Sequence, residues 1–130
     1  MAFNTNYRTL PGVVAGADLT DKQFHIVKVA STAGQVVLNA TSVFAGNVVG
    51  VLMNKPYTGE AAEVAIDGIA KCIVATSSLL AGDGVGCNTT SRGTDAGTTD
   101  NLARIGKALE ASSAAGDIIT VLLTPGGWRY

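Results

Sequence analysis

Short apolar runs separated by turn-forming segments predict a chain built of β-strands. Runs rich in β-branched residues favour strands, and the Gly, Ser, Asn and Pro clusters between them mark turns. The expected strands span residues 23–30, 35–41, 47–54, 63–74, 103–111 and 117–124, the last ending at Pro125. Residues 31–34 are expected to close a hairpin and residues 56–59 to form a turn between two later strands. Strands spaced about 8 to 12 residues apart are typical of a small all-β fold, a β-barrel or a β-sandwich.

The longest alternation spans residues 63–74. One face carries Val64, Ile66, Gly68, Ala70, Cys72 and Val74, and the other carries Glu63, Ala65, Asp67, Ile69, Lys71 and Ile73. Because successive side chains of a strand point to opposite faces, Glu63, Asp67 and Lys71 fit one exposed face better than a catalytic pair. Gly68 in the middle predicts a bulge or bend that lets one long ribbon serve two parts of the fold.

Two interpretations are open for residues 103–111. The residue types Ala, Leu, Glu, Lys and Arg favour a helix. Gly106 interrupts the segment, however, and the short connection at residues 112–117 leads into the next strand as a hairpin turn does. A strand is therefore the favoured prediction.

Two segments are expected outside the strands. Residues 1–20 contain the turn-forming residues Pro11, Gly12 and Gly16 and predict an extended N-terminal arm. Residues 21–130 then form a single β domain, in which residues 88–101 are polar and predict a long loop. No apolar run reaches the about 18 residues of a membrane span, and the start of the sequence has no signal-type apolar region. We therefore expect no membrane partner and synthesis in the cytoplasm without export.

The chain is unusually poor in charge. Of its 130 residues, 15% are charged, and the net charge is −1, from nine Lys and Arg against ten Asp and Glu. A soluble domain normally carries about 25% charged residues. One interpretation is that part of the surface is buried against partners, and the other is a compact monomer rich in small residues. The scattered charges provide no basic stripe for nucleic acid, so none is expected as a partner.

Candidate chemistry is sparse, and no enzyme is predicted. The single histidine, His25, lies between apolar residues, and no GxSxG motif accompanies it. One histidine and two separated cysteines fall short of a zinc site, and residues 82–88 match no phosphate-binding loop. Cys72 reads as a small buried residue and Cys87 as part of a glycine-rich turn, with a disulfide between them the less favoured alternative. We expect no catalytic residues, no cofactor and no metal.

Four segments in order resemble a known family. They are AGADLTDKQFHIVKV at residues 15–29, GVLMNKPYTGEAAEVAIDGIAK at 50–71, LLAGDGVGCN at 79–88 and IGKALEASSAAGDIITVLLTPG at 105–126. Together they resemble the capsid cement or head-decoration proteins of tailed bacteriophages, a family long catalogued only as a domain of unknown function. The insertion at residues 88–100 and the terminal GGWRY are less typical of it.

The resemblance implies a structural virion protein. Such a protein binds the outer surface of the assembled head and stabilises contacts between major capsid protein subunits. The implied partners are that coat protein and further copies of the chain, with a trimer favoured over a dimer. A small all-β binding module on a virion, recognising a receptor or a carbohydrate, is the alternative function.

Residue types suggest where partners are bound. Trp, Tyr and Arg often dominate interface energies, and both ends of the chain carry them. The expected contact residues are Tyr7, Arg8 and Leu10 in the arm and Trp128, Arg129 and Tyr130 in the tail. The arm is further expected to be able to add a strand to a neighbour's sheet. The alternatives are a disordered N-terminus and a tryptophan that covers the end of the domain.

Overall fold

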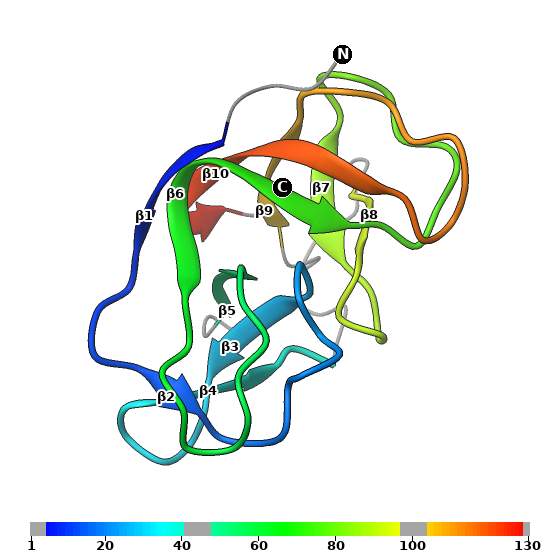
Figure 1. Ribbon diagram of the computed structural model, residues 1–130. Helices are drawn as coiled ribbons and strands as arrows, with labels where there is room; N and C mark the ends of the chain where they lie inside the picture. The colour runs from blue at the N-terminus through cyan, green and yellow to red at the C-terminus, as the bar shows by residue number, and fades with distance from the viewer. Residues whose placement is uncertain (1–4, 41–47, 97–103, 129–130) are drawn as a thin grey trace.

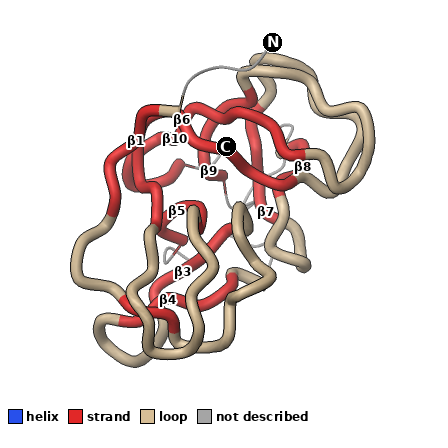
Figure 2. The backbone as a smooth tube through the Cα atoms, in the orientation of Figure 1, coloured by secondary structure: helices blue, strands red, loops and turns tan. Residues whose placement is uncertain are grey.

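The computed structural model describes residues 5–40, 48–96 and 104–128, with side chains described as far as Thr124. These residues form one small all-β domain without helices, as predicted (Figure 2). The strands are β1 (Asn6–Thr9), β2 (Val14–Ala15), β3 (Ile26–Val29), β4 (Gln35–Leu38), β5 (Val48–Leu52), β6 (Val64–Ile73), β7 (Gly84–Cys87), β8 (Gly93–Asp95), β9 (Arg104–Ala108) and β10 (Ile118–Trp128).

All ten strands belong to one sheet. Its order is β2-β4-β3-β5-β6-β10-β9-β7-β8, and β1 pairs with β6 beside this path (Figure 1). Only β2 and β4 run parallel, whereas the other pairs are antiparallel. A parallel bridge between Val74 and Gly93 also brings β8 beside the end of β6. The far edge of the sheet therefore curls back toward its centre.

The long strand β6 connects two halves of the sheet. Its first residues pair with β5, its residues from Gly68 onward pair with β10, and β1 lies along its other edge. Gly68 has a φ of 95°, which L-residues rarely adopt, and Figure 1 shows β6 curving strongly. The prediction that a bend at Gly68 lets one ribbon serve two parts of the fold is confirmed.

Two clusters of buried side chains form the core. One lies among β6, β7, β9 and β10, and the other among β2, β3, β4 and the first residues of β6. Neighbouring residues of β5, Val51 and Leu52, contribute to different clusters and are both fully buried. The same holds for Val64 and Ala65 at the start of β6. These stretches are buried on both faces, so strict alternation of apolar and polar residues ends there.

The expected strands all appear, with shorter bounds at most ends. Residues 103–111 contain β9, so the strand interpretation was the correct one, and β9 and β10 pair as a hairpin. The expected end at Pro125 was wrong, because β10 continues to Trp128. The register between β10 and β9 shifts between Leu123 and Trp128, so Pro125 lies where the regular ladder is interrupted. A proline, which has no N–H to donate, is tolerated at such a place.

The two segments expected outside the strands contribute to the fold. Residues 5–20, expected as an arm, contain β1 and β2, and Ala15 and Leu19 are core residues. Within the loop expected at 88–101, residues 93–95 form β8 and Ser91 is buried. Residues 1–4 of the arm and 97–101 of the loop lie outside the described residues.

Candidate partner-binding surface

The strand β1 is tied to β6 through side chains as well as backbone. The phenolic hydroxyl of Tyr7 donates a hydrogen bond to Oε2 of Glu63, at a distance of 2.5 Å. Arg8 lies directly opposite Asp67, and its Nε donates to both carboxylate oxygens, at 2.8 and 3.0 Å. The bond to Glu63 raises the pKa of Tyr7 to about 12, and the Arg8 guanidinium lowers the pKa of Asp67. Two of the carboxylates expected on the exposed face of β6 are therefore engaged by β1.

Leu10 continues this attachment beyond the end of β1. Its backbone N–H donates to the Val64 carbonyl at 3.0 Å, and its half-buried side chain packs against the second core cluster. The three arm residues predicted to contact a partner thus all contact their own chain. The Arg8 side chain nevertheless remains 75% exposed, so part of this surface stays open to solvent.

The predicted tail contacts are only partly described. Trp128 ends β10, where its backbone is in register with Arg104 of β9. Its side chain, Arg129 and Tyr130 lie outside the described side chains. The tail therefore stays a prediction.

A surface that sequence reasoning did not single out lies on the outer side of β6, β10 and β9. We call it the outer ribbon face, and it consists of Ile69, Lys71, Ile73, Lys107, Ile118, Thr120 and Leu122. The register places Ile118 opposite Ile73 and Leu122 between Ile69 and Lys107. Ile118 is 48% exposed and Leu122 43%, whereas Ile119, Val121 and Leu123 point into the core. Aliphatic side chains are thus paired across neighbouring strands on the solvent side.

The centre of the outer ribbon face is polar and internally satisfied. Thr120 is fully buried there, and the Lys71 ammonium donates to its Oγ1 at 3.1 Å. Glu110 accepts the Thr120 backbone N–H through Oε2 at 2.8 Å. Hydrogen bonding to the side chain and to the backbone N–H of Thr120 lowers the pKa of Glu110, and the Lys71 charge acts in the same direction. The carboxylate at the rim of the face is therefore used to fix β10 in place.

The sequence contained a signal for this face. In residues 118–123 the side chains on both faces of the strand are apolar, with Thr120 the single exception. On β6, Ile69 and Ile73 lie on the same face as the charged residues Asp67 and Lys71. A strand that is apolar in both phases is buried on both sides or has one apolar side open to a partner. The pairing of β6 with β10 brings both irregularities to the same surface, and that pairing could not be read from either segment alone.

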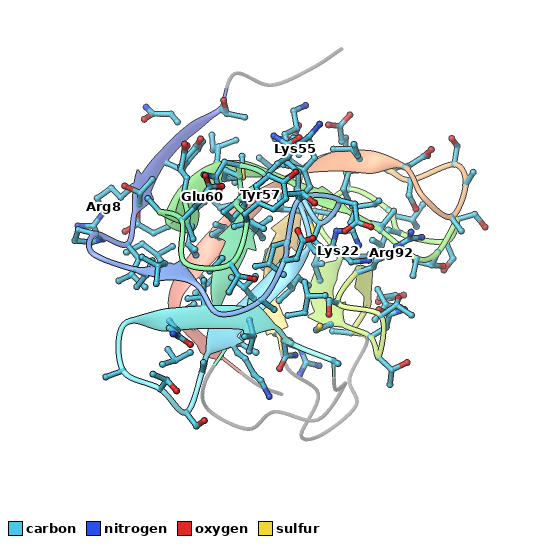
Figure 3. All side chains as sticks on the ribbon, turned by 60° about the horizontal axis from the view of Figure 1, so that its bottom comes forward. Arg8, Lys22, Lys55, Tyr57, Glu60 and Arg92 are labelled. Atoms are coloured by element: carbon cyan, nitrogen blue, oxygen red, sulfur yellow. The ribbon has the colours of Figure 1, made fainter. Side chains whose placement is uncertain are left out.

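A second exposed surface surrounds the loop between β5 and β6. Figure 3 shows Lys55, Tyr57 and Glu60 on the face that also holds Lys22 and Arg92. Tyr57 is 62% exposed, and its backbone N–H donates to Oε1 of Glu60 at 2.7 Å. Of the charged residues named here, Lys22, Lys55 and Arg92 are basic and Glu60 is acidic, and the Glu60 carboxylate is used within the loop itself.

The residues considered for catalysis or metal binding, His25, Cys72 and Cys87, are all buried. His25 is 6% exposed, and burial lowers its pKa, with the charges of Lys22 and Arg92 acting in the same direction. Burial also raises the pKa of Cys72 to about 12 and of Cys87 to about 11, and both are free thiols. Reactive thiols have lowered pKa values, so these two lack that activation. Within residues 5–40, 48–96 and 104–124, no three His, Cys, Asp or Glu side chains gather into a metal-binding group.

The chain matches no protein-family model and no curated protein. In the described part of the chain, no helix has the length and apolar character needed to cross a membrane.

Proposed function

We propose that this chain is a capsid cement protein. It binds the outer surface of an assembled phage head and stabilises contacts between major capsid protein subunits. One observation carries the proposal: the segments that resemble the cement family are the central strands of this fold. Residues 50–71 comprise the end of β5 and most of β6, residues 79–88 contain β7, and residues 105–126 contain most of β9 and β10. The resemblance thus covers a connected structural framework.

The surface chemistry supports the same function. A chain with 15% charged residues and paired aliphatic side chains on an outer sheet face is suited to burial against another protein. A cement protein acts by mass action, because a ligand that binds the assembled lattice and not the loose subunits stabilises the lattice by its binding free energy. If one homo-oligomer bridges several coat subunits, effective concentration strengthens contacts that are individually weak.

The alternative function is recognition of a receptor or carbohydrate by an all-β module on the virion. One observation favours it, the exposed ring of Tyr57. A sugar-binding platform stacks on aromatic faces, and Tyr57 is the one aromatic among the large apolar side chains that are exposed in the described residues. The cement function is therefore the better supported proposal.

Co-sedimentation separates the proposals. Purified protein is mixed with assembled shells and, in parallel, with unassembled coat subunits of the same phage. The cement function predicts saturable binding to shells and little binding to subunits. Equal binding to both, or no binding to shells, would contradict it. A glycan array in the same buffer tests the alternative, which requires a sugar hit that Tyr57→Ala abolishes.

A further inference from the structure

The outer ribbon face concentrates exposed aliphatic side chains. Ile118 and Leu122 are two of five large apolar side chains that are exposed in the described residues. The other three are scattered: Val29 ends β3, Tyr57 lies in the loop between β5 and β6, and Leu80 lies in the loop between β6 and β7. Ile118 and Leu122 instead stand on one strand, and each lies directly across from a half-buried isoleucine of β6. They extend an apolar surface over two strands.

The face is also rigidly supported. Its backbone is held by the β6–β10 and β10–β9 ladders, and the opposite side of the same strands forms the main core cluster. Lys71 and Glu110 are fixed by their bonds to Thr120. A surface held in place before binding loses little conformational entropy on association. This favours the outer ribbon face over the loops as a docking surface.

The charges on this face indicate what it fits. Glu63 and Asp67, the acids on the same side of β6, are engaged by Tyr7 and Arg8. Lys107 is exposed at the edge of the face and forms no ion pair with another described residue. A complementary partner therefore presents apolar side chains with a carboxylate opposite this lysine.

We infer that the outer ribbon face is the docking surface for the assembled coat lattice, against an apolar patch that carries a carboxylate facing Lys107. The inference rests on the proposed cement function and assigns that function to one side of the molecule. The aliphatic pairs supply the buried apolar area, and Lys107 supplies orientation. The surface with Tyr57, Lys55 and Arg92 then remains outside the contact.

The main test compares two equally exposed strand residues. Leu122→Glu places a carboxylate within the face, whereas Val29→Glu does so on β3, where the native side chain is 42% exposed against 43% for Leu122. Binding of each variant to assembled shells is measured by co-sedimentation over a range of protein concentrations. We expect Leu122→Glu to weaken binding by at least about tenfold, because a charge that replaces the leucine is desolvated at the interface and engages Lys107, its cross-strand neighbour, in place of the partner's carboxylate. Val29→Glu should bind as wild type.

A second pair of variants keeps the test independent of folding. Lys107→Glu and Lys55→Glu both change exposed lysines and leave the core untouched. Lys107→Glu should weaken binding several-fold at low salt and less at high salt, whereas Lys55→Glu should have no effect. Wild-type binding by both Leu122→Glu and Lys107→Glu would overturn the inference while leaving the cement function standing.

Two further outcomes would also overturn it. If wild type is an oligomer in sedimentation velocity and Leu122→Glu is a monomer, the face joins copies of this chain and not the coat. If wild type does not bind shells at all, the proposed function fails, and the docking surface fails with it.

Discussion

Replacing Gly68 by alanine should loosen β1 from the sheet. Gly68 has a φ of 95°, and a Cβ at this position would overlap the carbonyl oxygen of Asn6 and lie 2.9 Å from the Cα of Tyr7. Both neighbours are backbone atoms of β1, so no side-chain rotation can relieve the contact. Gly116 provides a matched control, because its φ is 94° and a Cβ there would meet nothing within 4 Å.

The expected costs follow from these two environments. A left-handed backbone costs a residue with a Cβ about 1 to 2 kcal/mol, partly offset by about 0.4 to 1 kcal/mol from the lower entropy of the unfolded chain. Gly116→Ala should therefore destabilise the protein by roughly 1 kcal/mol. Gly68→Ala adds an overpacking cost of about 1 to 3 kcal/mol, for a total of roughly 2 to 4 kcal/mol. That is a large share of the about 5 to 15 kcal/mol that stabilises a typical domain.

Urea unfolding of wild type, Gly68→Ala and Gly116→Ala measures the difference directly. Amide hydrogen exchange of residues 6–10 should show faster exchange in Gly68→Ala only, because β1 has to move away from the new methyl group. Equal stability of the two variants, with unchanged exchange in β1, would refute the argument that backbone contact makes glycine necessary at the bend.

Three other predictions concern ionisable groups. Tyr7 should titrate with a pKa of about 12 in ultraviolet absorbance, and Glu63→Gln should bring it down toward its usual value of 10, because the carboxylate acceptor is lost. Because the pKa of His25 is lower in the folded protein than in the unfolded chain, the unfolded chain takes up the proton at a higher pH. The free energy of unfolding is therefore unaffected by His25 above about pH 6.5 and decreases as the pH falls below it. Urea midpoints between neutral pH and about pH 5 should fall less in His25→Gln than in wild type, and identical slopes would contradict this. Cys72 and Cys87, with pKa values of about 12 and about 11, should react with a thiol reagent at about pH 8 only after unfolding, and rapid modification of the native protein would be inconsistent with their burial.

The sequence predicted the structure best for features that depend on a single strand. The alternation in residues 63–74 predicted β6, and Gly68 predicted its bend, because both depend on local backbone geometry. The hairpins at residues 31–34 and 112–117 were likewise predictable from their turn residues. The class of the fold followed from these elements together.

Reasoning from the sequence was less successful where distant segments meet. The first twenty residues look like an arm because one proline and two glycines mark turns in them. Tyr7 and Arg8 nevertheless bind the acidic residues Glu63 and Asp67, more than fifty positions away. Nothing local to either segment specifies that pairing. The extension of β10 past Pro125 similarly depends on an interruption in its ladder with β9.

The candidate surface shows the same limit. The low charge content allowed two interpretations, a surface buried against partners or a compact monomer, and the partner-binding residues predicted from residue type lay near the chain ends. The aliphatic residues of the outer ribbon face come from two segments, around Ile69 and around Leu122, and only the register of β6 with β10 places them side by side. Composition allowed a docking surface as one of two interpretations, and the strand pairing shows which exposed aliphatic residues lie together.

Cryo-electron microscopy of shells incubated with the protein would show whether it binds them and through which side. We expect additional density on the outside of the shell, bridging neighbouring coat subunits, with the side of β6, β10 and β9 that carries Leu122 turned toward the lattice. Shells without added density, or with density that contacts a single coat subunit through the loop at Tyr57, would contradict it.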